Sequence, residues 1–222
     1  AKGEKLAGKR VAISGSGNVA THAAEKAITE GLAVLTLSDR HGYLHSEVGL
    51  SAETVENIIK HKAVGKPLSE FHCPDGVSYQ DGTFYEAVEA DIYMPCATQN
   101  EVDETVAKII VEQGAILVAE GANMPLTLEA IKVIEDAGII LAPAKAANAG
   151  GVAVSGLEMA QNAAHRPWTS AQADEALRTI MADIHETCRR YGIQDNGSID
   201  YVKGANLGGF ARVFRAMQEL GW

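Results

Sequence analysis

The segment GSGNVA at residues 15–20 is the part of the sequence whose residue types and spacing most directly indicate chemistry. It has the form G-x-G-x-x-A and lies between an apolar run and a stretch with helical periodicity. In that context Gly15 permits a tight turn, Gly17 lets the backbone approach a pyrophosphate, and Ala20 lets the following helix pack on the strand. The N-terminus of that helix would hold the phosphates. The segment predicts dinucleotide binding, with an ordinary glycine-containing turn or a site for another nucleotide-like ligand as the alternatives.

A second polar group closes the next predicted strand, where the adenosine ribose of a dinucleotide would lie. Asp39 comes 22 residues after the second glycine, the position of the acid that accepts the ribose 2′-hydroxyl of NAD. However, Ser38 and Arg40 flank it, and Lys60 and Lys62 follow on the next predicted helix. A hydroxyl and cations suit the 2′-phosphate of NADP, although Asp39 would repel that phosphate unless a neighbouring cation offsets its charge. We predict coenzyme contacts by Ser38, Asp39, Arg40 and Lys62, with NADP favoured and NAD possible. The alternative for the two lysines is a solvated helix face.

Three further polar loops follow three successive predicted strands. They are PCATQN at residues 95–100, EGANMP at residues 120–125 and ANAGGVAVSGLEMAQN at residues 147–162. Open α/β sheets bind ligands at the carboxyl edge that such loops form. Asn123 and Asn148 each carry an amide that both donates and accepts, as recognition of a carboxamide requires. Each could instead serve only as a helix N-cap, because Pro or Gly follows closely.

Short apolar runs alternate with amphipathic stretches over about residues 9–145, and these elements must position the loops. The predicted strands are at residues 10–14, 33–38, 77–79, 91–95, 116–119 and 138–142. The predicted helices between them cover residues 19–30, 52–62, 103–112 and 127–137. After Pro143 only helices are expected, at residues 151–164, 170–191 and 198–220. The pattern predicts an α/β fold, a Rossmann-like doubly wound and mostly parallel sheet with a helical C-terminal portion at about residues 148–220. We expect one dinucleotide-binding domain over residues 1–222.

The composition excludes several classes of protein. The 222 residues are 46% apolar and 22% charged, as in ordinary globular domains. Lys plus Arg number 19 and Asp plus Glu 29, and the net charge of -10 argues against nucleic-acid or anionic-membrane partners. The sequence has neither a run of about 18 apolar residues nor a signal-sequence pattern, so we expect a cytoplasmic protein. Three widely spaced cysteines favour reduced thiols, with Cys96 packed rather than nucleophilic, and no metal-ligand spacing is present.

Together with the closing segment YVKGAN at residues 201–206, the four loops resemble, in order and spacing, the coenzyme domain of hexameric bacterial-type glutamate dehydrogenases. The resemblance runs from about Gly8 to Leu220. Its most specific part is the run NAGGVAVSGLEMAQN, which leucine, valine and phenylalanine dehydrogenases match less well although they share the fold.

The resemblance implies a set of coenzyme contacts along the carboxyl edge of the sheet. Beside the glycines, that set comprises Ser16, Asn18, Val19, Ala97, Thr98, Asn123 and Asn148. The residues of the glycine loop would contact the pyrophosphate, and the two asparagines would hold the nicotinamide ribose and carboxamide. Val152 and Ser155 would face the substrate, with the Ser155 hydroxyl bonding the side-chain carboxylate of glutamate. Ser155 could instead be a plain helix residue, and Met159 is expected in the core.

Family members also carry an N-terminal substrate domain with a Gly-Gly-x-Lys-Gly-Gly segment, a second lysine and a catalytic Asp, none of which occurs as a motif here. The resemblance therefore implies an NADP(H)-binding domain with no catalytic residue of its own. It would bind coenzyme without turnover, alone as a monomer or weak associate, whereas the parent would be a homohexamer that interconverts glutamate and 2-oxoglutarate. The alternatives are a stand-alone dinucleotide-sensing module and the coenzyme domain of a related amino-acid dehydrogenase.

Overall fold

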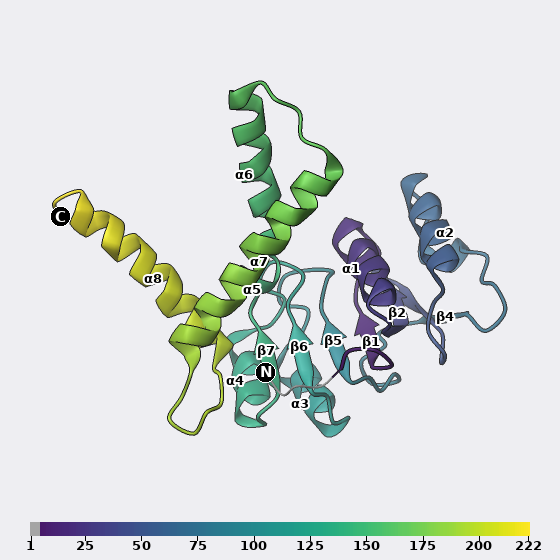
Figure 1. Cartoon of the computed structure of the whole chain (residues 1–222). Helices are drawn as coiled ribbons and strands as arrows, with labels where there is room; N and C mark the ends of the chain where they lie inside the picture. The colour runs from purple at the N-terminus through teal and green to yellow at the C-terminus, as the bar shows by residue number, and fades with distance from the viewer. Residues whose placement is uncertain (1–4) are drawn as a thin grey trace. The chain divides into compact units, whose positions relative to one another are not determined.

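A seven-stranded sheet forms the centre of the first part of the chain in the computed structural model, which describes residues 5–222 (Figure 1). The strand order is β4-β3-β2-β1-β5-β6-β7. The strands are β1 (Arg10–Ile13), β2 (Ala33–Ser38), β3 (Gly42–His45), β4 (Ser78–Asp81), β5 (Ile92–Met94), β6 (Leu117–Ala119) and β7 (Ile140–Ala142). β1 pairs in parallel with both β2 and β5, and β5 pairs in parallel with β6. The α/β class and the mostly parallel sheet predicted from the sequence are confirmed.

The chain changes direction across the sheet between β1 and β5. From β1 it moves outward through β2, β3 and β4, and it then returns to β5 on the other side of β1 and continues to β7. The loops after β1 and β5 therefore diverge at a topological switch point. In open α/β sheets, ligands bind at the carboxyl ends of the strands at such a point.

The antiparallel edge of the sheet differs from the prediction. β3 was not predicted at all, and it pairs antiparallel with β2 and with β4. The three residues between β2 and β3 form a tight turn, closed by a hydrogen bond of 2.8 Å from Asp39 N to Gly42 O. A four-residue strand so close behind another gives no separate periodic signal, and the sequence pattern therefore indicated only a loop.

Four helices of this unit agree with prediction to within a residue or two. They are α1 (Asn18–Thr29), α2 (Ala52–Ala63), α3 (Glu104–Glu112) and α4 (Leu128–Asp136). Ser51, Asp103 and Thr127 cap the last three through side-chain oxygens that accept from backbone N–H groups. A short 3-10 helix, η1 (Leu68–Glu70), was not predicted. The apolar core lies between α1, α2 and the central strands and includes Val11, Ile13, Val34, Leu37, Val55, Ile58 and Ile92.

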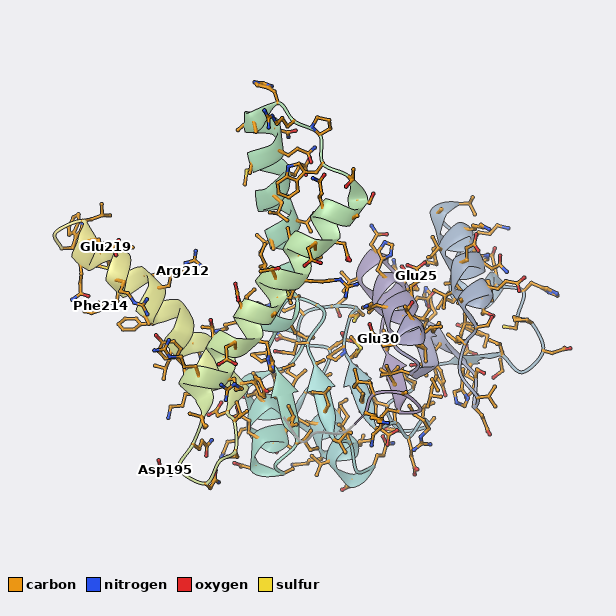
Figure 2. All side chains as sticks on the ribbon, in the orientation of Figure 1. Glu25, Glu30, Asp195, Arg212, Phe214 and Glu219 are labelled. Atoms are coloured by element: carbon orange, nitrogen blue, oxygen red, sulfur yellow. The ribbon has the colours of Figure 1, made fainter. Side chains whose placement is uncertain are left out.

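Only helices follow Ala142, where the chain divides into a second compact unit. They are α5 (Ala144–Ala147), α6 (Ala149–Ala164), α7 (Ser170–Gly192) and α8 (Tyr201–Glu219), of which α5 was not predicted. α7 and α8 approach so closely that a Cβ on Gly204 would collide with the carbonyl of Cys188. The exposed side of α8 carries large apolar side chains, among them Phe210 and Phe214, whose rings stack with centroids 5.8 Å apart (Figure 2). Within residues 5–222, no helix is both long and apolar enough to cross a bilayer.

Candidate functional site

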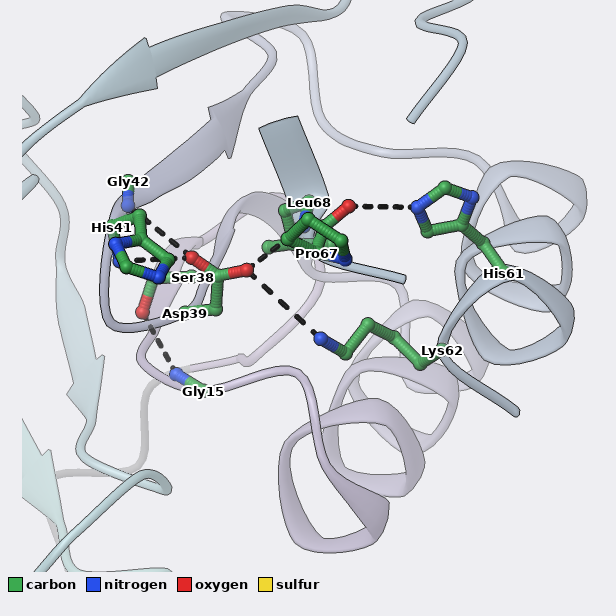
Figure 3. Close-up of polar contacts among 9 residues, drawn as sticks. All are labelled: Gly15, Ser38, Asp39, His41, Gly42, His61, Lys62, Pro67 and Leu68. Atoms are coloured by element: carbon green, nitrogen blue, oxygen red, sulfur yellow. Dashed lines mark hydrogen bonds and ion pairs between the residues drawn. The ribbon is translucent and has the colours of Figure 1, made fainter. Parts of the chain in front are cut away.

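The glycine loop after β1 is fixed to the end of β2. The N–H of Gly15 donates to Ser38 Oγ over 2.8 Å, and the N–H of Ser38 donates to Gly15 O over 3.0 Å (Figure 3). Gly15 has φ +87°, and a Cβ there would lie 3.1 Å from Cys96 O and 3.2 Å from Ala97 Cα. Gly15 is therefore required both by its left-handed backbone and by the contact between the loops after β1 and β5.

Gly17 serves a different purpose, because a Cβ built on it would meet nothing within 4 Å. It is the N-cap of α1, and among the described residues no side chain caps this helix and no acidic residue occupies its first turn. The first N–H groups of α1 therefore lack a side-chain cap at the positive end of the helix dipole. Asn18 and Val19 are exposed beside it, whereas Ser16 is buried. An uncapped helix end of this kind can hold phosphate groups, and the pyrophosphate site stays a prediction from the sequence.

The loop at residues 95–100 lies against the glycine loop. Ser14 Oγ accepts from Cys96 N over 2.8 Å and from Ala97 N over 3.2 Å, which ties the end of β5 to the end of β1. Ala97 and Thr98 are exposed. Cys96 is buried, and burial, followed by the charge of Glu101, raises the pKa of its thiol to about 12. The expectation of a packed thiol is confirmed.

Asp39 is held by backbone groups on both sides of its carboxylate. Oδ1 accepts from the N–H groups of His41 and Gly42 at 3.0 and 3.3 Å, and Oδ2 accepts from Leu68 N at 2.8 Å (Figure 3). Lys62 Nζ lies 3.9 Å from Oδ2. Burial by itself raises the pKa of the Asp39 carboxyl, but these N–H groups and the Lys62 ammonium outweigh it and hold the pKa below its ordinary value.

This arrangement changes what Asp39 offers to a coenzyme. A carboxylate has about four lone-pair positions, three backbone N–H groups already donate to this one, and the Lys62 ammonium lies 3.9 Å from Oδ2. Asp39 therefore organises the β2–β3 turn and the approach to η1, and its charge is compensated. The two lysines behave differently, since Lys62 turns toward Asp39 whereas Lys60 is exposed and pairs with Glu56 at 2.6 Å. Arg40 is the middle residue of this turn and is exposed.

A polar cluster around Glu101, which is half-buried behind the 95–100 loop, was not predicted. Glu101 Oε1 accepts from Ala97 N at 3.0 Å and from Thr98 N at 3.3 Å, and Oε2 accepts from the hydroxyl of Tyr85 at 3.4 Å. Burial raises the pKa of Glu101, and the hydrogen bonds only partly offset that effect. In the sequence, the only sign of this cluster is that an acidic residue, Glu101, lies four positions after Ala97. An acidic side chain just before a helix is usually solvated, so this sign did not indicate a contact with the loop.

The structure shows whether Asn123 and Asn148 serve as helix N-caps, and the answer differs between them. Asn123 is exposed, and it does not cap α4, because the Thr127 side chain accepts from Ala130 N at that helix start. The N-cap alternative for Asn123 is therefore wrong. Asn148 does occupy the N-cap position of α6, but no hydrogen bond from the described helix start to its side chain is formed there.

The predicted substrate residues lie on α6, in the second compact unit. Val152 and Ser155 are both exposed, and the Ser155 hydroxyl donates to Gly151 O at 3.2 Å. Met159 is 68% exposed, so its expected place in the core is wrong. α6 packs against α7, where Gly150 faces Leu177, and this packing leaves the Met159 side chain exposed.

Comparison with known proteins gives a consistent family. The sequence model described as Glutamate/Leucine/Phenylalanine/Valine dehydrogenase matches residues 1–221. The NAD(P)-specific glutamate dehydrogenase of Xylanibacter ruminicola is 45% identical over 221 residues, which cover 99% of this chain and 50% of that protein. The NADP-specific glutamate dehydrogenase of Escherichia coli is 45% identical over 219 residues, covering 96% and 48%. A crystal structure of Plasmodium falciparum glutamate dehydrogenase superposes with a TM-score of 0.92 at 38% identity, covering 96% and 46%. The chain spans about half the length of the curated relatives that it matches.

Proposed function

The chain belongs to the glutamate, leucine, phenylalanine and valine dehydrogenase family, and from that premise we propose that it is the coenzyme-binding half of an NADP(H)-linked glutamate dehydrogenase. The observation that carries the proposal is the contact between the glycine loop and the 95–100 loop at the switch point between β1 and β5. There the uncapped N-terminus of α1 and the open space at Gly17 match a pyrophosphate.

Preference for NADP(H) follows from the charges around Asp39. The names of the relatives include NADP-specific, NAD(P)-specific and NAD-specific enzymes, so family membership alone leaves the preference open. In this chain Lys62 and three N–H groups compensate Asp39, which removes the repulsion that a 2′-phosphate would otherwise meet. Arg40 then supplies an exposed guanidinium beside that position. A phosphate is bound more tightly by such charge-assisted contacts than a hydroxyl is.

Calorimetric titration of the chain at low salt tests this preference. We expect NADPH to bind more tightly than NADH, and Arg40→Ala to weaken NADPH alone by about 1–2 kcal/mol, the order of one charge-assisted hydrogen bond. Lys60→Ala is the matched control, because Lys60 pairs with Glu56 on an exposed helix face and should leave both affinities unchanged. Tighter binding of NADH by several-fold, or equal weakening of both coenzymes by Arg40→Ala, would contradict the assignment.

The proposed reaction is the oxidative deamination of L-glutamate with water to 2-oxoglutarate and ammonia. The nicotinamide, when bound, accepts the hydride in that reaction. The contribution of this chain is to bind and orient: Gly17 and the start of α1 hold the pyrophosphate, and the 95–100 loop and Asn123 border the nicotinamide end. The family resemblance also assigns a coenzyme contact to Asn148. We assign no proton-transfer residue to this chain, since those groups belong to the other half of the parent enzyme.

Ser155 is proposed to select glutamate through its side-chain carboxylate. In the complete enzyme, Ser155→Ala should lower kcat/KM for glutamate by about tenfold or more, the value of a hydrogen bond to a charged group. Norvaline, which lacks the carboxylate, is the matched control substrate and should be affected little. An equal loss for both substrates would mean that the hydroxyl serves α6 through its bond to Gly151 O.

We also propose that the parent enzyme is a homohexamer and that this chain alone is monomeric or weakly associating. The other half of the relatives' length corresponds to a further domain that these 222 residues do not cover. The exposed apolar side of α8, with Phe210 and Phe214, supports packing against such a domain, because exposed apolar patches commonly mark interaction surfaces.

A further inference from the structure

The 95–100 loop ends in a left-handed residue that is tied to another in the next loop. Asn100 has φ +56° and Met124 has φ +50°. Asn adopts this conformation more readily than most residues, whereas for Met it is uncommon and persists only where the surroundings impose it. The N–H of Asn100 donates to Met124 O at 3.0 Å, so the two left-handed residues are joined directly. Something must hold the 95–100 loop in this conformation.

Glu101 makes the contacts that do so. Its Oε1 accepts from the consecutive N–H groups of Ala97 and Thr98, and its Oε2 accepts from Tyr85, which is itself 5% exposed. Ala97 N is shared with Ser14 Oγ, the group that ties this loop to β1. Within residues 5–222 no cation forms an ion pair with Glu101. Removing a carboxylate even partly from water without a cation is costly, and the hydrogen bonds of the half-buried Glu101 to the loop offset that cost.

We propose that Glu101 is the positioning residue of the 95–100 loop, and that it fixes Ala97 and Thr98 where they border the nicotinamide half of the coenzyme. The inference rests on the proposed coenzyme function and deepens it. Glu101 does not touch the coenzyme in this scheme. It acts through the two N–H groups that it accepts from, and the contacts that hold Asp39 come from other residues.

The role predicts an effect confined to one half of the ligand. Glu101→Ala should weaken NADPH binding by about tenfold or more, as loss of hydrogen bonds to a charged acceptor implies. It should leave binding of adenosine 2′,5′-bisphosphate unchanged, because that probe carries only the adenosine half. Amide exchange measured without ligand should quicken at Ala97 and Thr98 but not at Gly15.

Glu101→Gln is the conservative variant that separates position from charge. Its carbonyl oxygen can accept from Ala97 and Thr98 while its amide donates to the Tyr85 hydroxyl, so it should restore NADPH binding to within about twofold of the wild type. Glu104→Ala is the control on the same segment, because Glu104 is exposed and pairs with Lys108. It should change neither affinity.

The possible outcomes are distinct. Normal NADPH binding by Glu101→Ala, or an equal loss for both probes, would overturn the positioning role, and so would failure of Glu101→Gln to restore binding. If Glu101→Ala does not fold, Glu101→Asp takes its place, since it withdraws the carboxylate from the two N–H groups by one methylene. Wild-type chain that binds neither probe would instead refute the proposed coenzyme function itself.

Discussion

Glutamate oxidation by the 222-residue chain alone is expected to be undetectable, while NADP(H) still binds. The coenzyme loops lie in this chain, but the lysines and the Asp that the family resemblance assigns to substrate binding and proton transfer do not occur in their motifs here. Lost orientation and lost acid–base assistance each cost several powers of ten in rate. The measurement is NADPH formation from glutamate and NADP⁺, followed by absorbance, with coenzyme binding checked by NADPH fluorescence on the same sample.

Restoration of activity is the matched control for that result. The complementary half of a close relative, fused upstream of Ala1, should give an active enzyme, and the half alone should be inactive. A fused protein in which Gly17 is replaced should again fail, because coenzyme binding is then lost. Robust turnover by the 222 residues alone would show that the catalytic groups lie within this chain.

Two glycines of the phosphate loop should respond in opposite ways to the same substitution. Gly17→Ala adds a methyl to open space at φ -83°, so the free energy of unfolding should stay close to that of the wild type. NADPH affinity should fall by about ten- to a hundredfold, because the methyl occupies the place where the pyrophosphate approaches the backbone. Gly15→Ala instead meets φ +87° and contacts of 3.1–3.3 Å, and should lower the free energy of unfolding by about 1–3 kcal/mol.

Urea unfolding of both variants, with and without saturating NADPH, measures the two effects together. For Gly17→Ala the ligand should add little stability, because stabilisation by a ligand depends on its affinity for the folded state. For Gly15→Ala the loss should be visible before ligand is added. The reverse pattern, a destabilised Gly17→Ala beside an unaffected Gly15→Ala, would refute the division of roles.

Much of the fold could be predicted from the sequence, because the parallel strands are apolar runs separated by amphipathic helices with capping residues such as Ser51. β3 could not, since its four residues follow β2 after a turn whose Asp39 also suited a ribose contact. From its spacing after the glycine loop, Asp39 was correctly predicted to lie at the end of β2. The spacing could not show that three backbone N–H groups donate to its carboxylate, because one of them belongs to Leu68, 29 residues later in the sequence.

In the candidate site, too, features with a local sequence signal could be predicted, whereas features that depend on contacts between distant residues could not. The glycine loop could be predicted because its glycine spacing, between an apolar run and a helical stretch, is itself a local sequence signal. The role of Glu101 could not, since it depends on Tyr85, which reaches Glu101 only in the folded chain. Met159 was misplaced for a related reason: helical periodicity identifies an apolar face but not whether another element covers it.

The way Asp39 is anchored limits how coenzyme preference can evolve or be engineered in this protein. Its carboxylate joins the β2–β3 turn to Leu68 and holds Lys62, so replacing it would disturb the local architecture as well as the ligand. The exposed Arg40 side chain makes no comparable contacts within residues 5–222. If Arg40 contacts the 2′-phosphate as proposed, a change of coenzyme preference is expected to be tolerated better at Arg40 than at Asp39, the residue that spacing alone would select for mutagenesis.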